Sequence, residues 1–349
     1  MKTHTNLYQK LCSKENLEFA YRKARKGKSQ KAYIKEFDRD LLNNLGLLEA
    51  ELKSETYLPM PLETFIIRDP KTRKIRKSHI RDRIVHHAIC NIISPIFEPL
   101  FIYDSFANRK WKGALKALER FDEFKRKASK NNTLTCFVFK ADIRHYFDEV
   151  NHDVLLSILR QKIADEQVIN LINKVLKNHS EKVWMPLGNL TSQTFQNIYL
   201  NVFDQFVKHE LRAEFYIRYV DDFVILDSDR SKLEEYKERI QAFLKDKLKL
   251  ELHQTKSKVL ALKNGIPFLG FRNFYYHRLL RKSNMLSMKN KIRVLSFDEL
   301  SVFLEGWIAY AKNASTFNLR TDIGTALESF FPGHISLMHI DRTMRYANG

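Results

Sequence analysis

The sequence predicts an α+β chain in which an antiparallel sheet carries helices on one face. Between residues 134 and 275, short apolar runs of strand length are mixed with stretches whose apolar residues recur at helical spacing. Their order is strand, two helices, hairpin, helix and strands, which suits an α+β layer. Glycine (10) and proline (8) are scarce in 349 residues, and no repeat or linker-like tract appears, so the lobes should pack as one body.

Each element is predicted from its apolar pattern and its flanking residues. The apolar run 136–139 indicates a strand that ends at Asp142. Helical spacing of apolar residues predicts one helix over 153–177, with Asn151 as its N-cap. The remaining expected elements are a hairpin near 65–75, a helix over 192–211, strands at 215–219 and 223–226, a helix over 231–248, and strands at 258–262 and 268–271.

The net charge is strongly positive. Lys plus Arg is 60 and Asp plus Glu is 41, giving +19, which predicts a polyanionic partner such as nucleic acid or an anionic membrane surface. One basic cluster alone usually indicates a solvated face, but four clusters around the same motifs predict a groove for a phosphate backbone. They are Arg22, Lys23, Arg25, Lys26, Lys28 and Lys31; Lys71, Arg73, Lys74, Arg76, Lys77, Arg81 and Arg83; Arg109, Lys110, Lys112 and Lys116; and Arg278, Arg281, Lys282, Lys289, Lys291 and Arg293.

Cysteine usage and hydropathy indicate the compartment. Cys12, Cys90 and Cys136 are odd in number and far apart, which argues against a disulfide framework or a cysteine metal site. No run approaches ~18 apolar residues, and the first ten residues lack an apolar signal core. We therefore expect a soluble, cytoplasmic protein with no membrane partner.

Three carboxylates stand where strands end. Asp142 follows an apolar strand, and Asp221 and Asp222 lie between two others. Carboxylates at a sheet edge are costly to desolvate unless they bind a cation or a strong donor. Three of them at neighbouring strand ends would bind hard cations, most naturally Mg²⁺, and two such ions can clamp a phosphoryl transfer. The alternative, an ordinary polar hairpin turn, is weakened by the second strand end at Asp142.

These motifs resemble those of reverse transcriptases. Tyr219-Val220-Asp221-Asp222 resembles the YxDD box, and the segment 139–148 resembles the first palm motif. Segments 70–73 and 81–88 are similar to the fingers motif, and Lys256-Ser257 to a later Lys-Thr motif. Pro186 to Gln193 and Phe268 to Phe271 resemble the segment that packs on the nascent base pair and the primer grip. The resemblance runs in the right order from about residue 60 to 275.

The resemblance implies a role for each matching residue. Asp142, Ile143, Asp221 and Asp222 would hold two Mg²⁺ ions, with Lys256 as a further catalytic residue. Lys71 and Arg73 would contact the triphosphate, and Phe147 would exclude the ribose 2′-OH. The residues that would pack on the base pair are Leu187, Gly188, Ser192 and Gln193. The primer grip would consist of Phe268, Leu269 and Gly270.

The resemblance also implies an architecture. It is a right-hand polymerase with a ferredoxin-like antiparallel palm sheet, helical fingers and a short helical thumb. The fingers would span 1–135, the palm 136–278 with a fingers insertion at about 151–188, and the thumb 285–349. Trp111, Trp184 and Trp307 are expected to pack in the core or between lobes rather than to stack on bases.

A finer resemblance concerns the subtype. Group II intron enzymes carry Gln before the glycine of the segment 186–193 and Ser-Pro at its end, whereas this chain has Leu187 and Ser192-Gln193. That pattern, and the tail 303–312, resemble the reverse transcriptases of diversity-generating retroelements. The resemblance implies copying of a template-repeat RNA into cDNA with errors at template adenines, from an RNA template, a DNA or RNA primer and dNTPs. It also implies a basic, pentameric accessory variability protein as partner.

Three alternatives stay open. An RNA-dependent RNA polymerase is disfavoured by Phe147, because a ribose 2′-OH would collide with its ring. A non-catalytic RNA-binding scaffold is disfavoured by the complete carboxylate set. A group II intron-like or phage-defence reverse transcriptase without a maturase domain remains the nearest rival.

Overall fold

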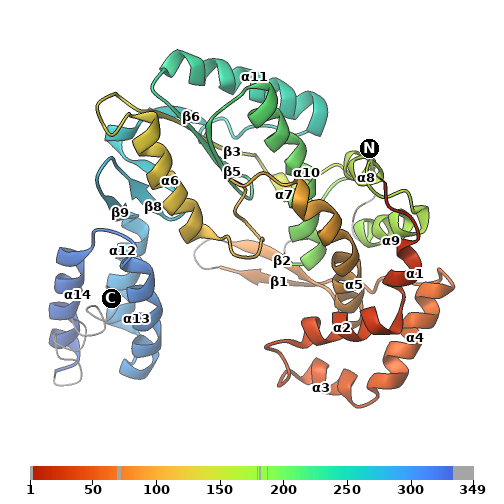
Figure 1. Ribbon diagram of the computed structural model, residues 1–349. Coiled ribbons are helices and arrows are strands. Elements are labelled where there is room, and N and C mark those ends of the chain that lie inside the picture. The colour runs from red at the N-terminus through yellow and green to blue at the C-terminus, as the bar shows by residue number, and fades with distance from the viewer. Residues whose placement is uncertain (1–2, 69–71, 179, 181, 187, 333–349) are drawn as a thin grey trace. The chain divides into compact units, whose positions relative to one another are not determined.

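The α+β class is confirmed by the structure. A computed structural model describes residues 3–68, 72–178, 180, 182–186 and 188–332 (Figure 1). The α-helices are α1 Leu7–Leu11, α2 Lys14–Arg25, α3 Ala32–Asp38, α4 Leu41–Lys53, α5 Ile80–Phe97, α6 Ala114–Ala128, α7 Tyr146–Glu149, α8 His152–Arg160, α9 Glu166–Lys177, α10 Leu190–Gln205, α11 Arg230–Leu248, α12 Lys282–Val294, α13 Phe297–Ala311 and α14 Phe317–Phe330. Short helical turns span Glu98–Leu100, Phe206–Glu210 and Leu262–Asn264.

The strands form three sheets within this part of the chain. Their order is β1-β2 in the first, β4-β5-β3-β6 in the second and β7-β8-β9 in the third. The pairs β1–β2, β7–β8 and β8–β9 are antiparallel. The strands are β1 Glu63–Ile67, β2 Arg73–Lys77, β3 Phe137–Asp142, β4 Phe215–Tyr219, β5 Asp222–Asp227, β6 Lys258–Ala261, β7 Ile266–Phe268, β8 Phe271–Asn273 and β9 Arg278–Leu280.

The chain divides into two compact units. The first comprises Met1–Arg120, Ala141–Ile225 and Glu234–Lys258, and the second comprises Phe121–Lys140, Leu226–Leu233 and Val259–Gly349. None of the helices in the described part of the chain is both long and apolar enough to cross a lipid bilayer. Cys12, Cys90 and Cys136 are buried and unpaired, as their spacing predicted.

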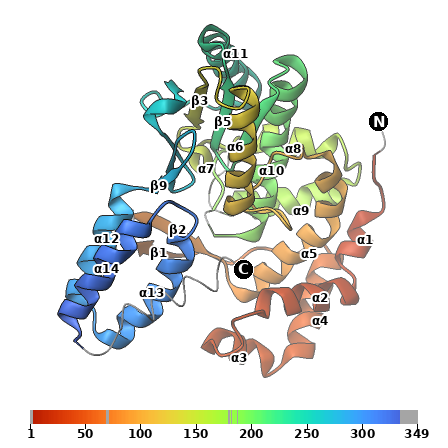
Figure 2. The same ribbon diagram turned by 60° about the vertical axis from the view of Figure 1, so that its left-hand side comes forward.

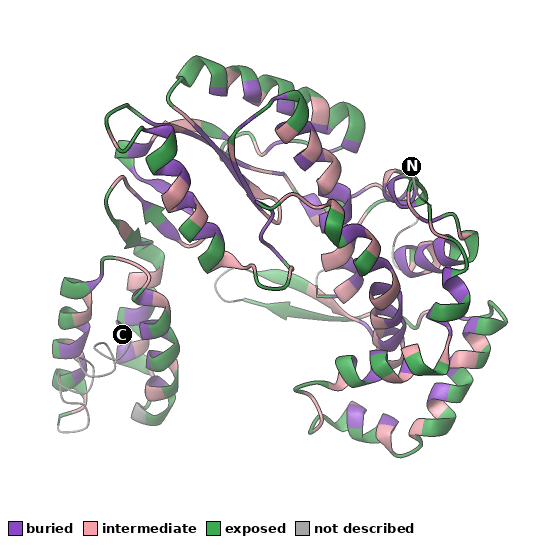
Figure 3. Ribbon diagram, viewed as in Figure 1, coloured by how far each residue is buried: buried purple, intermediate pink, exposed green. Residues whose placement is uncertain are grey.

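Helix α5 is central to the first unit. Helices α1, α2, α3 and α10 all pack against it. Its residues Ile84, Ala88 and Ile89 are completely buried, and Figure 3 shows buried residues along this helix while the β1–β2 hairpin is largely exposed. The predicted hairpin near 65–75 is confirmed, with Phe65 opposite Ile75.

The prediction of a single helix over 153–177 is wrong, because the structure has two helices there, α8 and α9. Asn151 caps its start as expected, accepting a hydrogen bond from the Val154 N–H at 3.0 Å. The helix then stops after Arg160 and a second one, α9, begins at Glu166. The break is stabilised by the Asp165 carboxylate, which accepts from the N–H groups of Leu7 and Tyr8 at 2.8 and 2.9 Å. A contact between residues so far apart in sequence leaves no trace in helical periodicity.

Two further expectations need correction. The strand predicted at 268–271 is the tip of a hairpin, because Leu269 and Gly270 both have positive φ (48° and 88°) between β7 and β8. Trp111, expected in a core, is 94% exposed, whereas Trp307 is buried as predicted.

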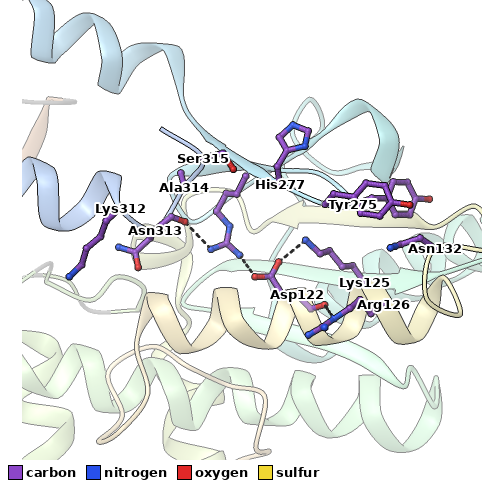
Figure 4. Close-up of a pocket in the computed structure, with 12 residues that line it drawn as sticks. Asp122, Lys125, Arg126, Asn132, Tyr275, His277, Lys312, Asn313, Ala314 and Ser315 are labelled. Atoms are coloured by element: carbon purple, nitrogen blue, oxygen red, sulfur yellow. Dashed lines mark hydrogen bonds and ion pairs between the residues drawn. The ribbon is translucent and has the colours of Figure 1, made fainter. Parts of the chain in front are cut away.

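The second unit contains the β7–β9 sheet and helices α12 to α14, which Figure 2 shows side by side. A polar cavity of about 520 Å³ opens beside the β8–β9 turn (Figure 4). Asp122 on α6 accepts from both Lys125 and Arg278, at 2.8 and 2.7 Å. Arg278 also donates to Asn273 at 2.6 Å, so one arginine links α6 to two strands of the sheet.

Candidate active site at the ends of strands β3 and β4–β5

The predicted carboxylates lie in the first unit on adjacent strand ends. Asp142 is the last residue of β3, Asp221 lies in the turn between β4 and β5, and Asp222 begins β5. The Ile143 N–H donates to the Asp221 carbonyl at 3.2 Å, which joins the two chain segments directly beyond the strands. Two segments that are nearly eighty residues apart in sequence therefore meet at neighbouring strand ends, as the sequence motifs predicted.

A third segment joins Asp142 from the other side. The His253 N–H donates to the Asp142 carbonyl at 2.8 Å, and Ile143 forms an isolated antiparallel bridge with Leu252. This pairing brings Lys256 to the site, where its Nζ donates to Asp142 Oδ1 at 3.1 Å. The lysine side chain is 46% exposed, so the ion pair is a weak contributor to stability and can open at low cost.

The surroundings of Asp221 disfavour its charged form in the absence of a cation. Burial, together with the neighbouring Asp142 and Asp222 carboxylates, raises the pKa of Asp221 to about 6. An acid whose pKa is raised by burial and by neighbouring acids is typical of a functional site. A bound cation beside Asp221 would stabilise its charged form.

The donor set suits a hard divalent ion. Its members are carboxylate oxygens, with Ile143 able to contribute only backbone because its side chain is apolar and 1% exposed. Among the described residues, no three His, Cys, Asp or Glu side chains already surround a point where an ion could sit. Lys256 occupies one oxygen of Asp142 and would have to withdraw before that oxygen could bind a metal ion.

The turn that carries the two aspartates is strained. Val220 has φ 61°, a left-handed conformation that is a genuine outlier for a β-branched residue. Its carbonyl accepts a hydrogen bond from Arg218 Nη1 at 3.1 Å. Strain of this kind persists only where the surroundings hold it, and the hydrogen bonds from Arg218 to Val220 and from Ile143 to Asp221 both hold the turn here.

Arg218 belongs to a completely buried polar network. Its Nε and Nη2 donate to the two oxygens of Asp204, each at 2.7 Å, and both side chains have no exposed surface. Nη2 also donates to Ser105 Oγ at 3.0 Å, and the Tyr216 hydroxyl donates to Asp204 at 2.7 Å. The sequence reasoning missed this network. The one feature of the sequence that could have indicated the network is Arg218 itself, a charged residue inside the apolar strand that leads to Val220.

Phe147 and Tyr146 have different environments. The Tyr146 hydroxyl donates to the Gln196 carbonyl at 3.4 Å, and its ring contacts Tyr199, so this residue belongs to the core. Phe147 is half-buried, five residues beyond Asp142, and its ring lies 5.2 Å from that of Tyr146. Only Phe147 of this pair has ring surface available to a nucleotide.

The segment expected to pack on the base pair is described in part. Leu187 lies outside the described residues, while Gly188 has φ 103° and a side chain there would press on Ile75 of β2. Ser192 is buried in the first turn of α10, and Gln193 beside it is half-buried. The segment is fixed at its base by a hydrogen bond of 2.9 Å from Ser78 to Asn189.

The basic residues of the β1–β2 hairpin are only partly described. Arg73 is exposed at the start of β2, and Lys71 lies outside the described residues. Arg76, which the sequence analysis named only as a member of a basic cluster, places its guanidinium 4.2 Å from the centre of the Trp184 ring. It is a second cation near the segment that leads to Gly188.

The residues of the expected primer grip lie in the second unit. Phe268 is completely buried against Phe121, with ring centres 5.8 Å apart, so its side chain faces the core. Leu269 and Gly270 form the half-exposed turn. The Tyr310 hydroxyl donates to the Gly270 carbonyl at 3.0 Å, which couples the turn to α13.

More than half of the chain, residues 67–273, matches the family described as reverse transcriptase (RNA-dependent DNA polymerase), and the chain belongs to that family. Its class is therefore that of an enzyme that polymerises DNA on an RNA template, and this family generally uses divalent metal ions.

Individual proteins resemble the chain over most of its length. It is 28% identical to protein YkfC of Escherichia coli (strain K12), covering 72% of this chain and 74% of that protein. It is 24% identical to the group II intron-encoded protein LtrA of Lactococcus lactis subsp. cremoris, covering 83% of this chain and 59% of LtrA. Apo telomerase from Candida tropicalis shares the fold, with a TM-score of 0.50 and 12% identity over 83% of this chain and 58% of that one. The chain thus spans little more than half the length of LtrA and of the telomerase.

Proposed function

We propose that this chain copies RNA into DNA, with Asp142, Asp221 and Asp222 as its metal-binding carboxylates. The main support is the hydrogen bond between Ile143 and Asp221, which holds the ends of two carboxylate-bearing segments together. Beside them lie Lys256 on Asp142 and the Val220 turn held by Arg218. A non-catalytic scaffold would gain nothing from an aspartate whose pKa is raised by burial and, to a smaller extent, by two acidic neighbours.

The protein's own groups would act as follows. Asp142 and Asp221, with Asp222 and the Ile143 backbone, would hold two Mg²⁺ ions. When bound, these ions would activate the primer 3′-hydroxyl and neutralise charge on the phosphates of the dNTP. Lys256, released from Asp142, would give a proton from Nζ to the departing pyrophosphate. Arg73 and Lys71 would bind the β- and γ-phosphates through charge-assisted hydrogen bonds.

The remaining site residues would select and position substrates. Phe147 would exclude the ribose 2′-OH, because its half-buried ring lies just beyond Asp142. Gly188, Ser192 and Gln193, with Leu187, would support the nascent base pair, and Leu269 and Gly270 with Phe268 would form the primer grip. On this proposal the fingers span 1–135, the palm 136–278 with an insertion at about 151–188, and the thumb 285–349, in a cytoplasmic enzyme.

The finer proposal is a diversity-generating retroelement enzyme. Its supports are Leu187 and Ser192-Gln193 in the segment 186–193, where intron enzymes carry Gln and Ser-Pro. Such an enzyme would copy a template-repeat RNA with errors at adenines and would work with a basic pentameric accessory protein. The rival proposal is an intron-like enzyme, which the similarity to LtrA favours.

One experiment separates the two proposals. Purified protein extends a DNA primer on a defined RNA template with dNTPs, and the cDNA is sequenced deeply. The retroelement proposal predicts errors concentrated at template adenines, reduced by Leu187→Gln, because a Gln can hydrogen-bond to the minor-groove side of the template strand and Leu cannot. Each tenfold change in discrimination corresponds to about 1.4 kcal/mol. Accurate cDNA from the wild type would favour the intron-like reading, and no cDNA at all would contradict both.

A further inference from the structure

Trp111 lies almost fully in solvent. Its side chain is 94% exposed, in the loop between the turn Glu98–Leu100 and helix α6. Among the tryptophans, Trp307 is 7% exposed and Trp184 lies under Arg76. A large aromatic side chain left in water forgoes the stabilisation that burial would give, so its position calls for a partner.

The loop that carries Trp111 is rigidly anchored. Arg109 Nη1 donates to the carbonyls of Ile102 and Ser105 at 2.7 and 2.9 Å, and its Nε forms an ion pair with Glu98 at 2.7 Å. The Gly113 N–H donates to the Phe106 carbonyl at 2.9 Å, which closes the loop. Trp111 itself has φ 61°. The exposed ring is therefore presented by a fixed backbone, at a cost in backbone strain, and not by a loose tail.

The loop itself carries positive charge. Lys110 is exposed and makes no ion pair among the described residues. The pKa of Lys23 on α2 is lowered, first by the partial burial of Lys23 itself and second by the positive charge of Lys110. Burial and then Lys23, Lys28 and Arg83 lower the pKa of His87 on α5 to about 4. Residues of three of the basic clusters found in the sequence are thus near enough to affect one another electrostatically. Three acids of this part of the chain are held in ion pairs, Glu98 with Arg109, Asp104 with Arg120 and Glu119 with Lys116.

We propose that Trp111 is a stacking platform for an unpaired base of the RNA strand, with Lys110 and Lys23 contacting its phosphates. An exposed ring in a loop that also carries the exposed Lys110 fits single-stranded nucleic acid, because every base offers a flat face and every linkage a negative charge. Paired bases in a duplex do not expose their faces to a side chain. This inference deepens the proposed function and rests on it, since it names a contact with the same RNA substrate.

Binding of a single-stranded RNA oligonucleotide tests the inference. The probe is a 12-nucleotide RNA, compared with an oligonucleotide of equal length and charge whose bases are removed. Base–aromatic stacking is worth about fivefold to one-hundredfold in affinity, so Trp111→Ala should weaken RNA binding by that factor and leave abasic binding unchanged. Trp111→Phe should retain an intermediate affinity. RNA should also quench the solvent-exposed component of tryptophan fluorescence, which Trp111→Phe removes.

The matched control is Phe317→Ala, which removes another exposed aromatic side chain (71%) from the second unit and should leave both affinities unchanged. Equal RNA affinity of wild type and Trp111→Ala would overturn the inference, as would an equal loss on the abasic strand. The wild type is assayed in parallel for primer extension on RNA. Extension without a Trp111 effect refutes the stacking platform alone, whereas the absence of extension refutes the proposed function.

Discussion

The buried pair of Arg218 and Asp204 offers a perturbation whose effects on folding and on catalysis can be separated. Arg218→Met leaves the Asp204 carboxylate buried, with only the Tyr216 hydroxyl as a donor among the contacts seen here. Breaking a buried pair in this way costs about 3–5 kcal/mol, a large share of the ~5–15 kcal/mol that a typical protein has. Urea unfolding of the variant should show that loss.

The double variant Arg218→Met/Asp204→Asn removes both charges and keeps an acceptor for Tyr216. Most of the lost stability should return, because no unpaired charge remains. The Val220 carbonyl, however, still lacks the charged donor that held it at 3.1 Å. A hydrogen bond of that kind is worth about 1.5–3 kcal/mol, so kcat for primer extension should stay about 10- to 100-fold low.

A matched control loses stability away from the turn. Tyr57→Phe removes a buried hydrogen bond of 2.8 Å to Asp82 and should lower the free energy of unfolding without changing kcat. If the double variant of Arg218 and Asp204 regains both stability and the wild-type kcat, the buried network stabilises the fold and has no effect on catalysis. The account of the strained turn would then be refuted.

Three further predictions follow from the site. In metal-free protein, burial and then Asp142 and Asp222 raise the pKa of Asp221 to about 6 in the folded state. Between about pH 4 and 6 the folded protein therefore keeps a proton on Asp221 that the unfolded chain has lost. The free energy of unfolding should therefore fall by up to about 3 kcal/mol as the pH rises from about 4 through 6, and Asp221→Asn should abolish that fall. Phe147→Ala should raise the use of rNTP relative to dNTP by about tenfold or more, measured as the ratio of kcat/KM values, and an unchanged ratio would remove Phe147 as the gate. Gly270→Ala would force a side chain into the Tyr310 hydroxyl at φ 88°, costing about 1–2 kcal/mol from backbone strain alone in urea unfolding. Full stability of that variant would mean that the turn can relax.

The parts of the site that the sequence predicted are those with local signals. Apolar runs located β3 and the β4–β5 hairpin, and their acidic ends identified Asp142, Asp221 and Asp222. The N-cap at Asn151 was likewise visible, since its side chain acts on the next three residues.

The features that were missed depend on contacts remote in sequence. The break between α8 and α9 is stabilised by Asp165 binding the backbone of Leu7 and Tyr8. Arg218 reaches Ser105 across more than a hundred residues. Trp111 was expected to pack in the core or between lobes, yet its loop is anchored through Arg109 and leaves the ring outside. Periodicity cannot report any of these contacts.

The most direct test of the central claim is primer extension by Asp221→Asn on an RNA template with Mg²⁺ and dNTPs. The substitution keeps the size of the side chain and removes a charge that the proposed metal site requires. Extension should fall by at least ~10³-fold, as expected when a metal clamp worth several kcal/mol is lost. Binding of the RNA should persist, since it depends on the basic clusters. Near wild-type extension by this variant would contradict the assignment of the catalytic carboxylates.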